Sequence, residues 1–269
     1  MRFSQALLPD CHDFYARRSA SDHLSYDVFG ISIGPFPDGL PAKEEDCANH
    51  VLHARGCYVM PNAAARISRT GSGAIKSTTV KPASGLEVQR MSARFHIITG
   101  GPGSGKTSLV GLLAMQGLCC MPEGGRAIIQ EQVANGGTAL PWADRAAFAS
   151  MMLDWELHAY KAAALCEGPV IFDRGLPDIV GYLQLNGLDV PLTVMHAVEV
   201  LPYAEQVFIA PHWPAIYRQD AERMQSEMEA KVTFEAMVDT YTSLGYQLIH
   251  LPLASVSERA AFVRSRINA

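Results

Sequence analysis

The sequence predicts an α/β fold in which a parallel sheet is covered by helices on both faces. From residue 94 onward, short continuous apolar runs alternate with segments whose apolar residues have helical spacing. Continuous apolar strands are typical of a parallel sheet, because both sides of each strand are buried. A glycine-rich loop also joins the first apolar run to an apolar helix, which brings backbone N–H groups and a helix N-terminus to one point.

Five apolar runs are expected to form the strands of this sheet. They are Phe95 to Ile98, Ala127 to Ile129, Val170 to Phe172, Val207 to Ala210 and Gln247 to Leu251. Between the second and third runs, Phe148, Met152 and Trp155 recur at steps of three and four, the spacing of one face of a helix. Ser255 followed by Glu258 has the spacing of a capping box, so the last helix is expected to begin there.

The N-terminal third of the chain differs from this pattern. Residues 1–60 carry prolines and glycines that interrupt any long element, and they are interpreted as a poorly defined extension or a small accessory lobe. Residues 61–90 have neither a helical nor a strand period and are interpreted as a linker, followed by the α/β domain at 91–269. Because Met91 stands directly before the first convincing strand, an over-extended gene start is an open alternative.

Composition and charge exclude several classes of protein. A chain of 269 residues with 48% hydrophobic residues can bury a core, which argues against global disorder. A net charge of −5 without a long basic run argues against binding along a nucleic-acid backbone. No run is long enough to span a membrane or to serve as a secretory signal, so we expect a cytoplasmic protein whose six cysteines are reduced thiols. These patterns do not specify an oligomeric state.

Residues 100–107 form a complete G-x-x-x-x-G-K-[ST] motif. The expected phosphate-binding residues are Gly100, Gly101, Pro102, Gly103, Ser104, Gly105, Lys106, Thr107 and Ser108. Glycines let the loop turn its N–H groups inward, and the following helix N-terminus adds partial positive charge. Lys106 is expected to neutralise the β- and γ-phosphates of ATP, and the Thr107 hydroxyl to ligate Mg²⁺.

A second metal ligand is expected at the end of a neighbouring strand. The apolar run Val170 to Phe172 ends in Asp173, which is predicted to hold Mg²⁺ or its waters. The alternative is that Asp173 caps the helix that starts near Leu176, a role that is compatible with metal binding.

Two motifs resemble those of known kinases. The sequence Gly-Gly-Pro-Gly-Ser-Gly-Lys at 100–106 looks like the loop of adenylate kinases, and Asp173-Arg174-Gly175 resembles the Asp-Arg motif of thymidylate kinases. Residues 94–268 are similar to the P-loop AAA-type ATPase/kinase family that includes the ribosylnicotinamide kinase domain, a group of nucleoside- and nucleotide-kinase-like P-loop NTPases. Adenylate kinases insert a glycine between the loop lysine and threonine, whereas Thr107 follows Lys106 directly, so adenylate kinase itself is disfavoured.

The resemblance implies a P-loop NTPase three-layer sandwich with a five-stranded parallel sheet of order 2-3-1-4-5. Substrate would enter above the ends of strands 2 and 3, and a basic lid would follow strand 4. Glu131, after the expected second strand, matches the position at which these kinases often place an acid that meets the acceptor. Arg174 matches the arginine that meets the acceptor or the transferred phosphoryl group. The alternatives are a solvated loop residue for Glu131 and a surface salt bridge for Arg174.

The implied lid contains two candidate catalytic arginines, Arg218 and Arg223. A guanidinium there would stabilise the charge that spreads over the transferred phosphoryl group as the site closes. Alternatively, both arginines form ordinary pairs on a helix surface, with Glu222 and Glu227 four residues downstream of each.

Taken together, these patterns predict a Mg²⁺-dependent P-loop phosphotransferase or ATPase that uses ATP. Its acceptor is expected to be small and nucleoside-like, or another hydroxyl or phosphate compound. The alternative is a nucleotide-binding regulatory or switch ATPase without a small-molecule acceptor. The sequence lacks an Asn-Lys-x-Asp motif, which argues against a GTPase switch, and residues 95–269 leave no room for the helical lid domain of a ring-forming AAA+ motor.

Overall fold

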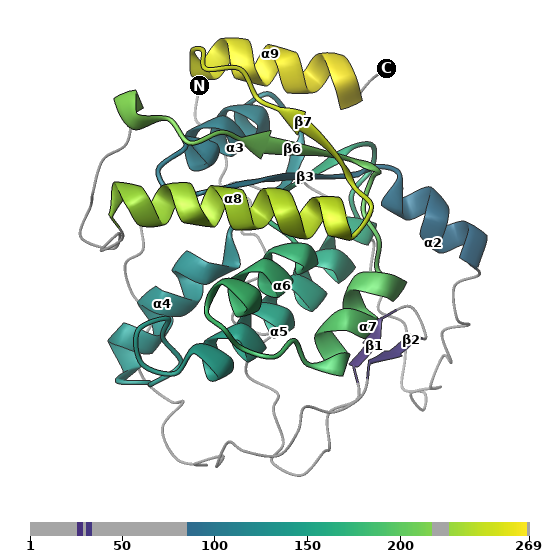
Figure 1. Ribbon diagram of the computed structural model, residues 1–269. Coiled ribbons are helices and arrows are strands. Elements are labelled where there is room, and N and C mark those ends of the chain that lie inside the picture. Colours follow the sequence, from purple (N-terminus) through teal and green to yellow (C-terminus); the bar gives the residue numbers. More distant parts are fainter. Residues whose placement is uncertain (1–25, 29–30, 34–84, 217–225, 268–269) are drawn as a thin grey trace, which may run out of the picture.

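The computed structural model of the chain describes residues 26–28, 31–33, 85–216 and 226–267 (Figure 1). The lid candidates Arg218 and Arg223 lie outside these residues, as does Glu222. Most of the segments interpreted as an accessory lobe and a linker also lie outside them.

A parallel sheet of five strands forms the centre of the described structure. The strands are β3 (Phe95–Gly100), β4 (Cys119–Met121), β5 (Val170–Asp173), β6 (Gln206–Ala210) and β7 (Gln247–His250). They lie in the order β4-β5-β3-β6-β7, and every neighbouring pair is parallel. Counted along the chain from β3, this order is 2-3-1-4-5, so the expected P-loop NTPase sandwich is confirmed.

Helices cover both faces of the sheet (Figure 1). On one face lie α3 (Lys106–Met115) and α9 (Val256–Ile267), and on the other lie α5 (Arg145–Ala164), α6 (Leu176–Leu185), α7 (Leu192–Val200) and α8 (Glu227–Ser243). Adjacent strand residues point into different cores: Ile97 packs with the α5 to α8 side and Ile98 with the α3 and α9 side. Burial on both sides is the reason that these strands are continuously apolar.

The second strand is not where the sequence pattern places it. Ala127 to Ile129 lie within helix α4 (Gly124–Asn135), and the second strand is β4, the edge strand Cys119–Met121. An edge strand of 3 residues that directly follows an apolar helix has no distinct apolar run of its own. The apolar run at Ala127 to Ile129 is part of a helix that buries one of its residues, Ile128, which is 2% exposed.

The N-terminal part of the described structure contains a hairpin and a helix. Strands β1 (Tyr26–Val28) and β2 (Ile31–Ile33) pair in antiparallel fashion, and β2 lies beside α7. Helix α2 (Gly85–Ser92) occupies the last residues of the segment interpreted as a linker, so residues 85–90 are helical. Within the described part of the chain, no helix is long and apolar enough to cross a membrane.

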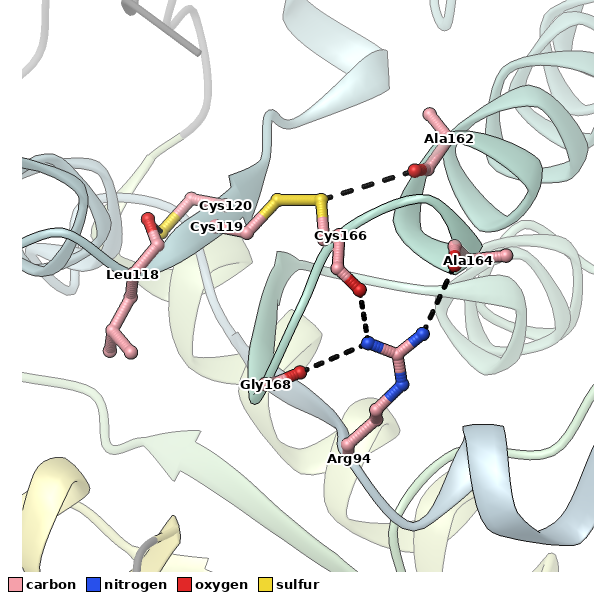
Figure 2. The surroundings of a disulfide bond; sticks show 8 residues. All are labelled: Arg94, Leu118, Cys119, Cys120, Ala162, Ala164, Cys166 and Gly168. Atoms are coloured by element: carbon pink, nitrogen blue, oxygen red, sulfur yellow. Dashed lines mark hydrogen bonds between the residues drawn. A yellow bond between two sulfur atoms is a disulfide. The ribbon is translucent and has the colours of Figure 1, made fainter. Parts of the chain in front are cut away.

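A disulfide joins Cys119 to Cys166, so these two residues are not the reduced thiols that we expected (Figure 2). The bond is a consequence of strand pairing: Cys119 on β4 is in register with Val170 on β5, close to the turn that carries Cys166. Arg94 holds the same turn, because its guanidinium donates hydrogen bonds to the carbonyls of Ala164 and Cys166 (Figure 2). The edge strand is therefore linked covalently to the end of α5.

Candidate active site

The loop between β3 and α3 has the backbone conformation that its glycines predict. Gly100 and Gly105 have φ angles of 126° and 78°, a region that residues with a side chain rarely adopt. At Gly100 an added Cβ would also collide with the carbonyl of Ala210 on β6. The loop therefore turns tightly against the sheet and delivers the N-terminus of α3, with its unpaired N–H groups, to the end of β3.

The side chain of Lys106 is folded back onto this loop. Its Nζ donates hydrogen bonds to the carbonyls of Gly100 at 2.9 Å and Gly101 at 2.8 Å, and the residue is 6% exposed. Burial and the nearby charge of Arg174 lower the pKa of Lys106 to about 8, although surrounding carboxylates oppose the shift. Its charge is therefore incompletely balanced, and an anion in the loop would stabilise it.

The two expected metal ligands have the donor atoms that Mg²⁺ prefers. Thr107 is exposed in the first turn of α3, and Asp173 ends β5, in register with Ile98 of β3. Asp173 is 3% exposed, and its Oδ1 has no hydrogen-bond partner among the described residues. Burial and the charge of Glu123 raise the pKa of Asp173 to about 7. A hydroxyl and an unpartnered carboxylate oxygen suit a hard cation, so these residues fit the implied Mg²⁺.

Arg174 connects the ends of three strands and is not a surface salt bridge. It has a φ angle of 75°, which is unusual for a residue with a side chain and marks local backbone strain. Its Nε donates to Glu123 at 2.9 Å, and its Nη1 donates to Asp178 at 3.0 Å and to the Gly100 carbonyl at 3.2 Å. Burial disfavours its charge, but the carboxylates of Glu123 and Asp178 outweigh this effect and raise the pKa of Arg174.

The acid beside Arg174 is Glu123, whereas Glu131 lies elsewhere. Glu131 is an exposed residue of α4 and does not line the cavity described below, because the strand expected to precede it is part of that helix. Glu123 follows the true second strand, β4. Burial alone would raise the pKa of Glu123, but Arg174 and Lys106 lower it to about 2. Assigning Cys119–Met121 as the strand would have identified Glu123 from the sequence.

Asp178, in the first turn of α6, is a central residue that the sequence patterns do not single out. Its Oδ1 accepts a hydrogen bond from the Thr99 hydroxyl at 2.6 Å in addition to the one from Arg174. Its Oδ2 accepts from the Tyr241 hydroxyl at 2.6 Å and from the Gly175 N–H at 3.0 Å. Asp178 therefore fixes both Arg174 and the start of α6. The sequence signal that could have identified Asp178 is its position three residues after Gly175, the residue that precedes α6.

A cavity of about 610 Å³ extends from the loop across the ends of β4 and β5. One end is polar and includes Lys106, Thr107, Glu123 and Arg174. The other end is formed mainly by apolar and aromatic side chains, among them Trp142, Phe148, Met152, Ile179 and Tyr182. A cavity of this size and mixed lining is typical of sites for small organic molecules.

Glu156 is an unpartnered acid in the wall of this cavity. It lies on α5, four residues after Met152, and is 6% exposed. Its Oε2 has no hydrogen-bond partner among the described residues. Burial and the charge of Asp178 raise the pKa of Glu156 well above its usual range, which favours the neutral carboxyl form that can donate a hydrogen bond.

Comparison with known proteins gives a family and a fold. A family model described as an AAA domain matches residues 95–259. Among solved structures, the chain is similar to the NadR protein in complex with NR, with 14% identity over 68% of this chain and 54% of that chain and a TM-score of 0.51. The chain thus spans about half of that protein.

Two further solved structures share part of this likeness. One is deoxyadenosine kinase from M. mycoides, with 16% identity over 65% of this chain and 98% of that chain and a TM-score of 0.48. The other is thymidylate kinase from Ehrlichia chaffeensis, with 17% identity over 66% of this chain and 100% of that chain and a TM-score of 0.46. No curated protein matches the chain in sequence.

Proposed function

Because the chain belongs to the AAA domain family and has a P-loop nucleoside- and nucleotide-kinase-like fold, we propose that it is an ATP- and Mg²⁺-dependent phosphotransferase. Its acceptor is a small nucleoside-like compound that presents a hydroxyl or phosphate group. The observation that carries this proposal is the cavity, which continues from the phosphate loop past Glu123 and Arg174 to an aromatic end. It offers space for a second molecule beside the triphosphate, which a switch ATPase does not need.

The loop side of the site binds the triphosphate. Backbone N–H groups and the N-terminus of α3 bind the phosphate oxygens. When ATP binds, Lys106 Nζ donates to the phosphate oxygens in place of the carbonyls of Gly100 and Gly101. Thr107 and Asp173 are the residues that would hold Mg²⁺, which neutralises charge on the phosphate oxygens when it is bound. Binding of ATP therefore supplies the negative charge that buried Lys106 lacks.

The strand-end side of the site orients the acceptor. Glu123 remains ionised beside Arg174, and its carboxylate can accept a hydrogen bond from an acceptor hydroxyl. With a pKa of about 2, Glu123 is a weak base, so it contributes mainly by aligning the hydroxyl for in-line attack. Arg174 lines the cavity between Glu123 and the loop, where its guanidinium can face the phosphoryl group in transfer.

The aromatic end of the cavity supports a ring-shaped acceptor. Phe148 and Tyr182 pack against each other with ring centroids 5.5 Å apart, and both line the cavity with Trp142. Planar apolar surfaces of this kind bind rings by stacking and edge contacts. Glu156 adds one hydrogen-bonding group to the same wall, which would meet a polar atom of the ring or sugar.

A transfer screen tests the proposal. The full chain is incubated with ATP, Mg²⁺ and a panel of nucleosides, nucleotides and vitamins, and mass spectrometry follows the formation of a phosphorylated compound. Under the proposal, one class of acceptor gains a phosphoryl group, and Lys106→Ala abolishes the product. Consumption of ATP without a phosphorylated product from any compound in the panel would favour the switch ATPase instead.

A further inference from the structure

Arg259 is one of the largest fully buried side chains in the described part of the chain. It lies in the first turn of α9 and is 2% exposed. Its Nη1 donates a hydrogen bond to the Ser104 carbonyl at 3.0 Å and lies 2.8 Å from the position that a Cβ on Gly105 would take. A guanidinium from the last helix therefore packs directly against the phosphate loop, 155 residues away in the sequence.

Among the residues that the structure describes, no carboxylate balances this charge. Within the described residues, Arg259 forms no ion pair, and its Nε has no hydrogen-bond partner. Burial lowers the pKa of Arg259, as expected for a cation without a counter-charge. Burying an unpaired cation is unfavourable, so a position that retains one points to an anion that arrives later. The phosphate loop is the adjacent anion site.

The geometry of the peptide group explains how Arg259 can act on that anion. A trans peptide is planar, so the C=O of Ser104 and the N–H of Gly105 point in opposite directions. In a phosphate loop the N–H groups face the ligand, which places the carbonyls on the outer side. A guanidinium that binds the Ser104 carbonyl therefore fixes the Gly105 N–H toward the phosphate and polarises it.

We propose that Arg259 is a positioning residue for the di- or triphosphate group: it orients the Ser104–Gly105 peptide, and its own charge is balanced by the bound phosphates. The inference rests on the proposed binding of ATP and is independent of the acceptor. It implies that Arg259 strengthens binding of ligands whose phosphates occupy the loop, and has little effect on the nucleoside part.

The test measures binding of ATP and of AMP to the full chain by calorimetry with Mg²⁺ present. The variants are Arg259→Met, Arg259→Lys and the control Arg266→Met, which removes an exposed arginine from the same helix. We expect Arg259→Met to weaken ATP binding by about tenfold or more, the loss of one charge-assisted hydrogen bond. Arg259→Lys keeps the charge without the planar guanidinium and is expected to weaken ATP binding by about threefold or more. Arg266→Met should bind ATP as the wild type does.

The ratio of ATP affinity to AMP affinity separates positioning from a merely structural role. If Arg259 positions the phosphates, the ratio falls in both Arg259 variants, whereas general loosening of the fold weakens both ligands equally and overturns the inference. If Arg259→Met does not fold, Arg259→Lys decides, and an unchanged ratio there overturns the inference. If the wild type binds ATP and the Arg259 variants bind it equally well, only this inference is refuted. If the wild type does not bind ATP, the proposed function is refuted as well.

Discussion

Replacing Lys106 with methionine is expected to stabilise the nucleotide-free chain at neutral pH while abolishing its use of ATP. The side chain is 6% exposed and charged, and the surrounding carboxylates do not compensate fully for its burial. Methionine keeps most of the apolar length and removes the charge. The charge therefore serves binding of phosphate at the expense of stability, as is common for groups in functional sites.

The magnitude follows from the pKa of Lys106, which falls from its ordinary value of 10.5 to about 8. At about 1.4 kcal/mol per unit, holding the charge in the folded chain at pH 7 costs up to about 3 kcal/mol. Methionine removes one donor from each of the carbonyls of Gly100 and Gly101, but Arg174 Nη1 and Ser104 Oγ still donate to them, so the loss is about 1 kcal/mol or slightly more. The net gain in the free energy of unfolding is then about 1–2 kcal/mol.

The dependence on pH identifies the cause. Since the folded pKa of Lys106 is lowered, the folded chain releases this proton near pH 8, whereas the unfolded chain keeps it up to about 10.5. The wild type therefore gains stability relative to the variant as the pH rises through that window. The advantage of Lys106→Met at pH 7 should shrink and reverse by pH 10.5.

The assay is urea denaturation of the wild type and Lys106→Met at pH 7 and at pH 10, with ATP turnover measured in parallel. We expect the two free energies of unfolding to converge or cross between these pH values, and only the wild type to turn over ATP. A variant that is less stable at pH 7, with a pH profile parallel to that of the wild type, would refute the electrostatic argument. Retained turnover would refute the assignment of Lys106 to the phosphates.

The other predictions concern the acceptor side, the metal and the disulfide. Glu123→Gln is expected to misalign the acceptor hydroxyl and so to lower transfer by about 100-fold in steady-state kinetics while ATP binding survives. Glu131→Gln should change neither transfer nor binding; equal effects of the two variants would contradict the placement of the acid. Asp173→Asn should lower turnover and weaken its dependence on Mg²⁺ in a metal titration; an unchanged Mg²⁺ profile would count against this ligand. Glu156→Leu should raise the acceptor KM by about tenfold, whereas Glu156→Gln, which keeps a donor, should not; equal KM values would exclude a polar contact. Cys119→Ala should lower the free energy of unfolding, measured with urea, by up to about 4 kcal/mol, because the disulfide joins cysteines 47 positions apart in the sequence. A reductant should remove the difference between the variant and the wild type.

The fold was predictable because its signals are local. Four of the five strands and the capping box at Ser255 and Glu258 follow from runs of a few residues, and the structure contains them. The phosphate loop and Asp173-Arg174 are equally local, because strand ends place them together. The edge strand Cys119–Met121 was missed, since its 3 residues carry no period of their own.

Helix α5 shows why a correct element does not guarantee a correct face. The spacing of Phe148, Met152 and Trp155 predicts the helix, but its core-facing residues include Leu153 and Leu157, which are 0% and 1% exposed. The predicted stripe lies at the border of core and cavity: Phe148 is buried and Met152 packs against the core, both also line the cavity, and Trp155 reaches toward Pro122. A helix that is apolar on two sides has two apolar stripes, and the sequence alone does not show which of them packs against the sheet.

The contacts that complete the site were not predictable, because each one joins distant segments. Glu123 and Asp178 meet at Arg174 although 55 positions separate them in the chain. Arg259 reaches the loop from the last helix, and nothing in the run around it distinguishes it from the surface arginines of the same helix. Such residues are recognised only when the sheet order brings the strand ends and the loop together.

Transfer of the terminal phosphoryl group of ATP to a small acceptor can be followed by a radioactive label on that group. The wild type and Lys106→Met are incubated with γ-labelled ATP, Mg²⁺ and each nucleoside or nucleotide in turn, and the labelled products are separated. We expect only the wild type to transfer label to a nucleoside-like acceptor. Label that remains in ATP, or that appears only as inorganic phosphate with every acceptor, would contradict this expectation.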